Sequence, residues 1–458
     1  MARQRDLPRF ACTLFVLWLV ACSAGGGASD DDDAIVLGDR NAGSPLSLVD
    51  QRQLSPRLLE LQFATPALED QGFAAPESGG GTGKVRLLLP AGYARSQARY
   101  PVLVLLHGAE GNYRDWTDHG AVEALTANLP LIVVMPDGGA AGQYTDHYNA
   151  GRYGPPAYES YHVGQLIPWI DLNLRTVGAR AGRAVAGVSM GGFGAMSYAA
   201  RHPDLFAAAA AFSGAVDTND RILWPLIGSQ VFGSRSTAEV RWRGSNPVDL
   251  APNLANLRLI LYSGNGEPNL IDAAFDLVER VVYRQSENLH EVLVGLGIAH
   301  DWIDYGPGSH TWPYWQQDLR ETLPALMQVF ASPAPAPSPL RHAAIEAQYE
   351  VFGWRVELQR PALEFSTLSE ADRTGFVLEG SGSALVRTPA FYAPGSTHVV
   401  EVARASTETS RTQATADPDG RLWIGVPLGR ANAHPQYTIA AALAGGTKVY
   451  TARVAIDP

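Results

Sequence analysis

Short apolar runs alternate with amphipathic stretches between residues 54 and 331. Residues 102–106 and 131–135 are almost wholly apolar, which is typical of strands buried on both faces of a parallel sheet. Residues 161–174 instead carry apolar side chains at helical spacing. Further strand-like runs occur at residues 58–63, 85–89, 207–212 and 257–262. This alternation predicts a three-layer α/β domain over residues 54–331, with a mostly parallel sheet and helices on both faces.

The pattern changes after residue 331. Residues 332–339 are rich in proline, which is typical of an extended linker. Residues 354–359 then alternate apolar and polar side chains with the period of a strand. Similar runs recur at residues 376–386, 398–403, 422–426, 437–443 and 449–456. About six short strands without a helix predict an all-β, sandwich-like domain over residues 340–458.

The N-terminus has the pattern of a targeting segment. Three arginines precede a short apolar run at residues 10–20, and the tetrapeptide Leu-Val-Ala-Cys ends at Cys22. This tetrapeptide resembles a bacterial lipobox, in which the cysteine is lipidated. Residues 1–22 are therefore predicted to be a lipoprotein signal peptide, and residues 23–53 a flexible tether. The expected location is exported and membrane-anchored, with a plain signal peptide or an inserted anchor as alternatives.

Composition and charge exclude several classes of function. The formal net charge of −11 argues against a nucleic-acid partner. Both cysteines, Cys12 and Cys22, lie in the targeting segment. A mature chain would thus have no thiol for catalysis, for a disulfide or for a metal site. Because motifs for zinc proteases and for phosphate binding are also absent from the sequence, no metal or organic cofactor is expected.

Ser189 lies in the sequence AGVSMGG at residues 186–192, between a strand-like run and a helix-like run at residues 193–200. A serine on a sharp strand-to-helix turn has its side chain pushed out of the fold, and small neighbours permit the tight turn. This arrangement predicts a nucleophile elbow of an α/β-hydrolase. The amide of the next residue, Met190, is then expected to donate to an oxyanion.

A serine needs a histidine as its base, and a carboxylate must orient that histidine. In this fold the order along the chain is serine, acid, histidine. His310 fits, because it lies in a loop between a strand-like run and the last helix of the domain. His290 and His300 are the competitors, but each lies within or just before a predicted element, where a surface role is more usual.

The acid is harder to assign by spacing. Five carboxylates follow the strand predicted at residues 257–262: Glu267, Asp272, Asp276, Glu279 and Glu287. Spacing favours Glu267 or Asp272, because they lie closest to the strand end. Asp272 and Glu279 are expected on one face of the same helix. The pattern by itself does not separate these candidates.

Several segments between residues 58 and 330 resemble the bacterial serine esterases related to esterase D and the mycobacterial mycolyltransferases. These segments are LLHGA at 105–109, VVMPDGG at 133–139, YTDHY at 144–148, YSGNGEP at 262–268 and SHTWPYW at 309–315. In the mycolyltransferase branch the acid is a glutamate in the helix after the glycine-rich turn. That position matches Glu279 in FDLVER at 275–280, so the resemblance implies the triad Ser189, Glu279 and His310. Geometry and resemblance together place the second oxyanion donor at the amide of Ala109.

The chain also departs from the mycolyltransferases. His107 replaces their acidic residue before the oxyanion-loop glycine, and Glu110 replaces a basic residue. Because those positions line the sugar pocket of the transferases, trehalose is not expected as the acceptor. The resemblance therefore implies a carboxylesterase that acts on a small-molecule or lipid ester and is tethered to a membrane by its lipid.

Two other functions stay open at this stage. An acyltransferase would pass the acyl group to a sugar or lipid hydroxyl instead of water. A catalytically inactive surface binding protein would keep the fold without the chemistry. The segment at residues 217–250 contains Trp224, Phe232 and Trp242 and is either a lid over the pocket or a pair of packed helices.

Overall fold

The structure is a computed structural model of the chain, and it describes residues 35–69, 80–151, 154–220, 222, 224, 228–269, 273–404 and 408–457. The chain divides into two units, Met1–Ala34 and Ile35–Pro458, and the first lies wholly outside the described residues. The predictions of a signal peptide and of lipidation at Cys22 therefore fall outside them. Within the described part of the chain, no helix is both long and apolar enough to span a bilayer.

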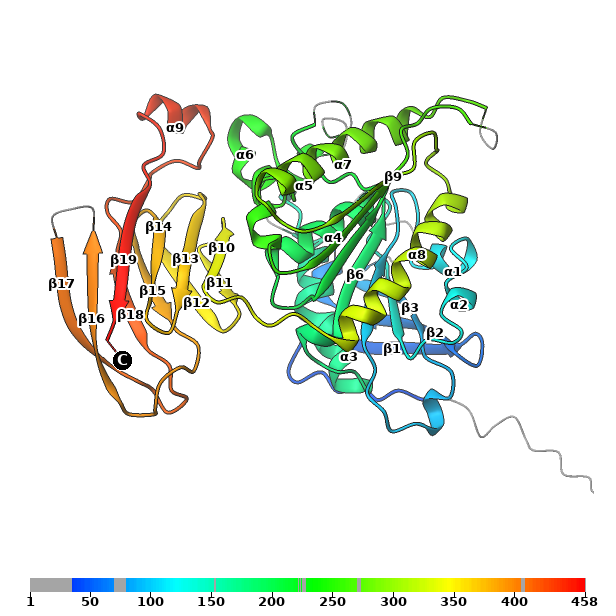
Figure 1. The fold of residues 1–458 in the computed structure, drawn as a ribbon, viewed down its shortest axis with the longest axis horizontal. Helices are drawn as coiled ribbons and strands as arrows, with labels where there is room; N and C mark the ends of the chain where they lie inside the picture. The colour runs from blue at the N-terminus through cyan, green and yellow to red at the C-terminus, as the bar shows by residue number, and fades with distance from the viewer. Residues whose placement is uncertain are drawn as a thin grey trace, which may run out of the picture. The chain divides into compact units, whose positions relative to one another are not determined.

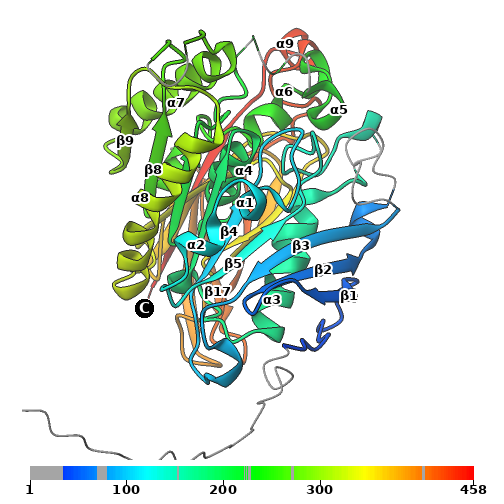
Figure 2. The same cartoon turned by 90° about the vertical axis from the view of Figure 1, so that its right-hand side faces the viewer.

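Residues 47–304 contain a nine-stranded sheet with the order β1-β2-β3-β5-β4-β6-β7-β8-β9 (Figure 1). Its strands are β1 (Ser47–Gln53), β2 (Leu58–Ala64), β3 (Thr82–Leu88), β4 (Val102–Leu106), β5 (Ile132–Pro136), β6 (Arg183–Val188), β7 (Ala208–Phe212), β8 (Arg258–Ser263) and β9 (Asp301–Asp304). The pairs from β5 to β9 are parallel, and β1, β2 and β3 add an antiparallel edge. Figure 2 shows this edge on one side of the sheet and β9 on the other.

Helices cover both faces of the sheet. They are α1 (Asp115–Asp118), α2 (Val122–Leu125), α3 (Ile167–Asn173), α4 (Met190–Arg201), α5 (Gly228–Phe232), α6 (Arg235–Gly244), α7 (Leu277–Gly295) and α8 (Trp312–Ala331). Alternate residues of β4 enter two different cores: Val104 packs in the core that includes α3, α4 and α7, and Leu103 in the core that includes α1, α2 and α8. The predicted three-layer α/β fold is confirmed, and it is the α/β-hydrolase architecture.

The C-terminal boundary predicted for the tether is wrong. It was expected to reach residue 53, but β1 pairs with β2 from Ser47↔Ala64 to Gln53↔Leu59. Before this strand, Ile35 and Leu46 are already buried in the core of the sheet. The pattern did not indicate a strand because β1 lies at the edge and is mostly polar. Main-chain hydrogen bonds hold such a strand, so it needs no apolar face.

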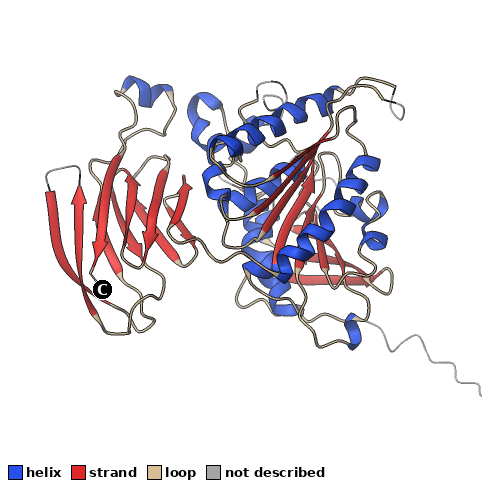
Figure 3. Cartoon of the chain, in the orientation of Figure 1, coloured by secondary structure: helices blue, strands red, loops and turns tan. Residues whose placement is uncertain are grey.

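Two antiparallel sheets follow α8 and form a second, sandwich-like domain around one core (Figure 3). The first sheet contains β10 (Leu340–Ala344), β13 (Ser366–Asp372), β14 (Gly375–Gly380), β16 (Thr397–Arg404), β17 (Glu408–Thr415) and β19 (Tyr450–Ile456). The second contains β11 (Gln348–Val351), β12 (Trp354–Gln359), β15 (Ser383–Arg387) and β18 (Trp423–Pro427). The all-β class is confirmed.

Two details of this domain differ from the prediction. Within this second domain, the described residues contain ten strands instead of about six. The segment at residues 437–443 was expected to be a strand, yet it contains the short helix α9 (Ile439–Leu443). The cause is local: the side chain of Thr438 accepts a hydrogen bond from the amide of Ala441 and caps the helix.

Candidate active site

Ser189 occupies the turn between β6 and α4, as predicted. Its backbone has φ 55° and ψ −116°, a conformation that costs energy for any residue other than glycine. The amide of Ser189 donates to the carbonyl of Phe212 at 2.9 Å, which fixes the turn against β7. The side chain is half-buried. The turn thus holds the serine at the carboxyl end of the parallel strands, where such sheets place their ligand sites.

The glycines beside Ser189 are required by close packing. A Cβ on Gly187 would lie 2.3 Å from the carbonyl oxygen of Gly191. A Cβ on Gly191 would lie 2.6 Å from the carbonyl oxygens of both Leu106 and His107. Any side chain at either position would push the elbow away from β4, so the Gly-x-Ser-x-Gly pattern follows from the geometry of the turn.

His310 lies in the loop between β9 and α8. Its Nδ1 is 2.7 Å from Oε2 of Glu279, so the structure brings the predicted base and the predicted acid together. The ring is half-buried, and the edge of Trp315 contacts it at a centroid distance of 4.9 Å. Because Nδ1 faces the carboxylate, Nε2 is the nitrogen left for proton transfer.

Glu279 lies in the first turn of α7 and is fully buried. Its Oε1 accepts three hydrogen bonds: from the amide of Gly264 at 2.7 Å, from Oγ of Ser213 at 2.9 Å and from Oγ of Ser263 at 3.0 Å. These donors satisfy the oxygen that does not face His310. The carboxylate is therefore fixed in one orientation, with its second oxygen aimed at the imidazole.

Asp276 positions both members of this pair, and sequence reasoning gave it no such role. It is the N-cap of α7, and its Oδ1 accepts from the amide of Glu279 at 3.0 Å. Its Oδ2 accepts from the amide of His310 at 2.7 Å. Burial alone would raise the pKa of Asp276, but these amide hydrogen bonds lower it below its ordinary value. The available signal was the sequence Asp-x-x-Glu, which is a capping pattern at a helix start.

The other candidates for the acid and the base include Glu267, Asp272, His290 and His300. Glu267, which spacing favoured, is exposed, and Asp272 lies outside the described residues. His290 and His300 contact each other, with Nδ1 of the first 2.7 Å from Nε2 of the second. Glu279 contacts His310 although spacing favoured other carboxylates, because α7 begins beside the histidine loop.

The loop after β4 lies next to the nucleophile. A Cβ built on Gly108 would be 3.5 Å from Cβ of Ser189, so the backbone leading to Ala109 passes beside the serine. Met190 is the first residue of α4, where amides have no partner within the helix. Both amides predicted as oxyanion donors therefore belong to segments that flank Ser189.

Hydrogen bonds of His107 hold this loop in place. It is buried, and its Nε2 accepts from the amide of Gly138 at 2.8 Å while Nδ1 lies 2.7 Å from the carbonyl of Gly108. The hydroxyl of Tyr144 donates to the carbonyl of His107 at 2.9 Å. The departure from the mycolyltransferase pattern at His107 is thus buried and acts on the shape of the oxyanion loop.

The segment at residues 217–250 contains α5 and α6, packed around a cluster of buried aromatic rings. Trp224, Phe232 and Trp242 join Phe193 of α4 in this cluster. Ring centroids lie 4.9 Å apart for Phe232 and Trp242 and 5.0 Å apart for Phe193 and Trp224. Of the two open interpretations, the described residues match the packed helices.

A mostly parallel sheet with a serine on a strained elbow after its central strand β6 defines an α/β-hydrolase. The sequence matches the protein family described as "Putative esterase" over residues 77–326. Since this match spans more than half of the chain, the protein belongs to that family.

The chain is similar to two curated proteins and to one solved structure. Esterase Rv1288 of Mycobacterium tuberculosis (strain ATCC 25618 / H37Rv) is 34% identical over 290 residues, covering 60% of this chain and 60% of that protein. The diacylglycerol acyltransferase/mycolyltransferase Ag85B of Mycolicibacterium smegmatis is 27% identical over 291 residues, covering 58% of this chain and 87% of that protein. Among solved structures, an S-formylglutathione hydrolase from Agrobacterium tumefaciens is 17% identical with a TM-score of 0.49, covering 62% of this chain and 99% of that one. The match thus spans only 60% of the length of the mycobacterial esterase.

Proposed function

We propose that the protein is a serine carboxylesterase that hydrolyses carboxylic esters through an acyl-enzyme on Ser189. The observation that carries this proposal is the 2.7 Å contact between His310 and the fully buried Glu279 in a chain whose elbow presents a serine. Membership of an esterase family supports it independently. The first alternative is transfer of the acyl group to a sugar or lipid hydroxyl, and the second is a binding protein without catalysis.

The proposed reaction follows from this geometry. His310 Nε2 takes the proton of Ser189 as Oγ attacks the ester carbonyl, and Glu279 stabilises the imidazolium through Nδ1. The amides of Ala109 and Met190 donate to the oxyanion. His310 then protonates the leaving alcohol, which leaves the acyl group on Ser189. Water then gives a proton to His310 and attacks the acyl carbonyl, and His310 returns that proton to Oγ of Ser189 as the acid is released.

The test is hydrolysis of p-nitrophenyl esters from acetate to palmitate by the full-length protein and by Ser189→Ala. Turnover that disappears in the variant, together with labelling of the wild type by a fluorophosphonate probe, is the expected result. A stoichiometric burst without turnover would favour the transferase, since the acyl-enzyme would then lack its acceptor. Folded protein that shows neither burst nor labelling would overturn the catalytic proposal and favour the binding protein.

The transferase alternative has one specific observation in its favour. The relative Ag85B carries a diacylglycerol acyltransferase/mycolyltransferase name and matches 58% of this chain. The decisive measurement is product analysis with and without added glycerol or sugar. An acylated sugar formed at the expense of free acid would make transfer the main reaction, whereas free acid alone would leave hydrolysis.

We also propose that the protein is exported and anchored to a membrane by a lipid on Cys22. The support is the lipobox-like sequence that ends at this residue. Metabolic labelling with a palmitate analogue tests it. Label in the wild type that is lost in Cys22→Ala is expected, and an unlabelled wild-type protein would contradict the anchor.

A further inference from the structure

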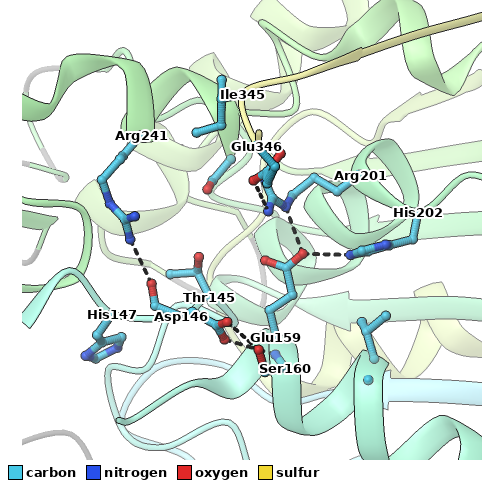
Figure 4. A pocket seen from close by; sticks show the side chains of 13 residues that line it. Thr145, Asp146, His147, Glu159, Ser160, Arg201, His202, Arg241, Ile345 and Glu346 are labelled. Atoms are coloured by element: carbon cyan, nitrogen blue, oxygen red, sulfur yellow. Dashed lines mark hydrogen bonds and ion pairs between the residues drawn. The ribbon is translucent and has the colours of Figure 1, made fainter. Parts of the chain in front are cut away.

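A cavity of about 430 Å³, lined by charged, polar and apolar side chains, lies at the C-terminal end of α4. Its walls come from residues 145–147, from the turn η6 (Ser160–Leu166), from α4 and α6, and from residues 345 and 346 after β10. Figure 4 shows Arg241 and Asp146 on one side and the group of Glu159, Arg201 and Glu346 on the other. Ser189 precedes the first residue of α4, whereas Arg201 is its last, so a helix of about 18 Å separates them.

Ion pairs join the charged side chains in one wall of the cavity. Nε of Arg201 donates to Glu159 at 2.8 Å, and Nη2 of the same guanidinium donates to Glu346 at 2.7 Å. Nε2 of His202 lies 2.7 Å from the same oxygen of Glu159. Burial would raise the pKa of Glu159, but Arg201 and His202 lower it to about 2. Two carboxylates against one guanidinium leave this wall with no excess positive charge, so it does not favour an anionic ligand.

The opposite wall offers alternating donors and acceptors. Both oxygens of Asp146 accept from Ser160, one from its amide at 2.9 Å and the other from its hydroxyl. Each carboxylate oxygen has two lone pairs, so each can accept a second hydrogen bond. Nη2 of Arg241 donates to the carbonyl of Asp146 at 3.0 Å. The hydroxyls of Thr145 and Ser245 also line the cavity.

This composition selects one class of ligand. Among the residues that the structure describes, no group of three or more His, Cys, Asp or Glu is placed to hold a metal ion. Vicinal hydroxyl groups match a carboxylate with two accepting oxygens, and further hydroxyls accept from guanidinium groups. Val163 and Ile345 add apolar surface for C–H groups, and the volume lies in the range of about 300–1,000 Å³ common for small-molecule sites.

We propose that this cavity binds a neutral saccharide, held by Asp146, Arg241 and the Glu159–Arg201–Glu346 group. Such a site would attach the enzyme to a glycan while Ser189 acts elsewhere. Because Ile345 and Glu346 follow β10, the second domain supplies part of the site. The proposal does not depend on the esterase assignment, since it concerns residues outside that site.

Gly164 provides a clean way to fill the cavity. It lies in η6 and lines the cavity, and a Cβ added there meets nothing within 4 Å. Gly164→Leu therefore adds a side chain at the cavity lining, at a position where its Cβ meets no neighbouring atom, and removes a glycine from a helical turn. Gly295→Leu is the matched control, because Gly295 ends α7, is exposed and has equally open space around its Cβ.

The experiment is isothermal titration of the full-length protein with maltose, cellobiose, lactose, trehalose and sucrose at millimolar concentrations. At least one disaccharide is expected to bind, with affinity lowered at least about tenfold in Gly164→Leu and unchanged in Gly295→Leu. Asp146→Asn keeps the shape and an acceptor for Ser160, and it is expected to weaken binding as well. Hydrolysis of p-nitrophenyl acetate, measured on the same samples, is expected to stay at the wild-type level in all three variants.

Three results would overturn the proposal. The first is no detectable binding of any of the five disaccharides by the wild type. The second is a disaccharide whose affinity is the same in Gly164→Leu as in Gly295→Leu, which would place its site elsewhere. The third is tighter binding of sulfate or phosphate than of every sugar, which would make the cavity an anion site.

Discussion

The two ends of helix α4 hold their neighbouring residues in different ways. At its start, Ser189 has a strained backbone, and its glycine neighbours allow main-chain atoms to approach closely. At its end, Arg201 is held by carboxylates on two sides. A serine side chain is presented at the first end, and an arginine is ion-paired at the second. The contrast is between backbone geometry, which positions Ser189, and ion pairing, which holds Arg201.

The largest effect is expected from Ser189→Ala, which changes only the residue that precedes α4. The kcat/KM for p-nitrophenyl acetate should fall roughly 10⁶-fold, because the nucleophile itself is lost. The free energy of unfolding in urea should stay close to that of the wild type, since the change removes one hydroxyl from a half-buried position. Residual turnover within tenfold of the wild type would show that another residue is the nucleophile.

Glu279→Gln tests the contact between Glu279 and His310 near the start of α4. The imidazole of His310 would lose the carboxylate that accepts from Nδ1, and kcat should fall about 10⁴-fold. Glu267→Gln is the matched control, because that side chain is exposed and near in sequence. Equal activity losses in the two variants would remove Glu279 from the triad.

Glu159→Gln removes one of the two ion pairs that hold Arg201 at the end of α4. Arg201 would keep one carboxylate but lose the other in a buried position, so the protein should lose about 3 kcal/mol of stability at pH 7. The pKa of Glu159 is about 2 in the folded chain, below its unfolded value. Its stabilisation is therefore present above roughly pH 4.3 and is lost as pH falls toward 2.

Urea unfolding of wild type and Glu159→Gln across this range measures the effect, and the difference between them should shrink with acidification. The exposed pair Arg453–Glu370 supplies the control, and Glu370→Gln should leave the unfolding midpoint unchanged. A Glu159→Gln protein as stable as the wild type at pH 7 would refute the importance of the ion pairs at this end of α4. Its esterase activity at 25 °C should stay near the wild-type level.

The smallest effect is expected from Asp276→Ala, which loosens the link between Glu279 and His310. Loss of the N-cap should cost about 1–2 kcal/mol of stability. The kcat should fall between about tenfold and a hundredfold, because the amide of His310 loses its acceptor. The pKa of Asp276 is lowered in the folded chain, so this stabilisation is present above the unfolded pKa of about 3.9 and is lost as pH falls through the folded pKa.

Asp276→Asn separates the two contributions, since asparagine also caps helices well. Thermal unfolding should show recovered stability in this variant, and kinetics should show kcat above that of Asp276→Ala. If Asp276→Ala kept full kcat while losing stability, Asp276 would be a helix cap without influence on His310.

Local sequence patterns predicted most of the features around Ser189. The elbow at Ser189 and the buried strands β4 to β6 were recognised because a tight turn and a doubly buried strand each leave a mark within a few residues. His310 was favoured for a similar reason, as the loop between a strand and the last helix is visible in sequence. Glu279 came from resemblance, and spacing pointed instead to Glu267 or Asp272.

Several strands and one helix had no recognisable local sequence pattern. The edge strand β1 is polar and is held by main-chain hydrogen bonds, so its side-chain pattern resembled a tether. Strands β10, β11, β13 and β17 were missed in the second domain because they are short or carry mostly polar side chains. Helix α9 replaced a predicted strand because one side chain, Thr438, caps it.

The sequence by itself determined the α/β class of the first domain, the all-β class of the second and the position of the elbow, since periodicity and glycine placement act over short stretches. Only the tertiary structure decided which carboxylate meets His310 and that Asp276 positions both partners. It also decided that residues as distant as Asp146, Arg241 and Glu346 line one cavity. Those contacts join segments far apart in the chain, and their energies depend on burial and distance, which no local pattern encodes.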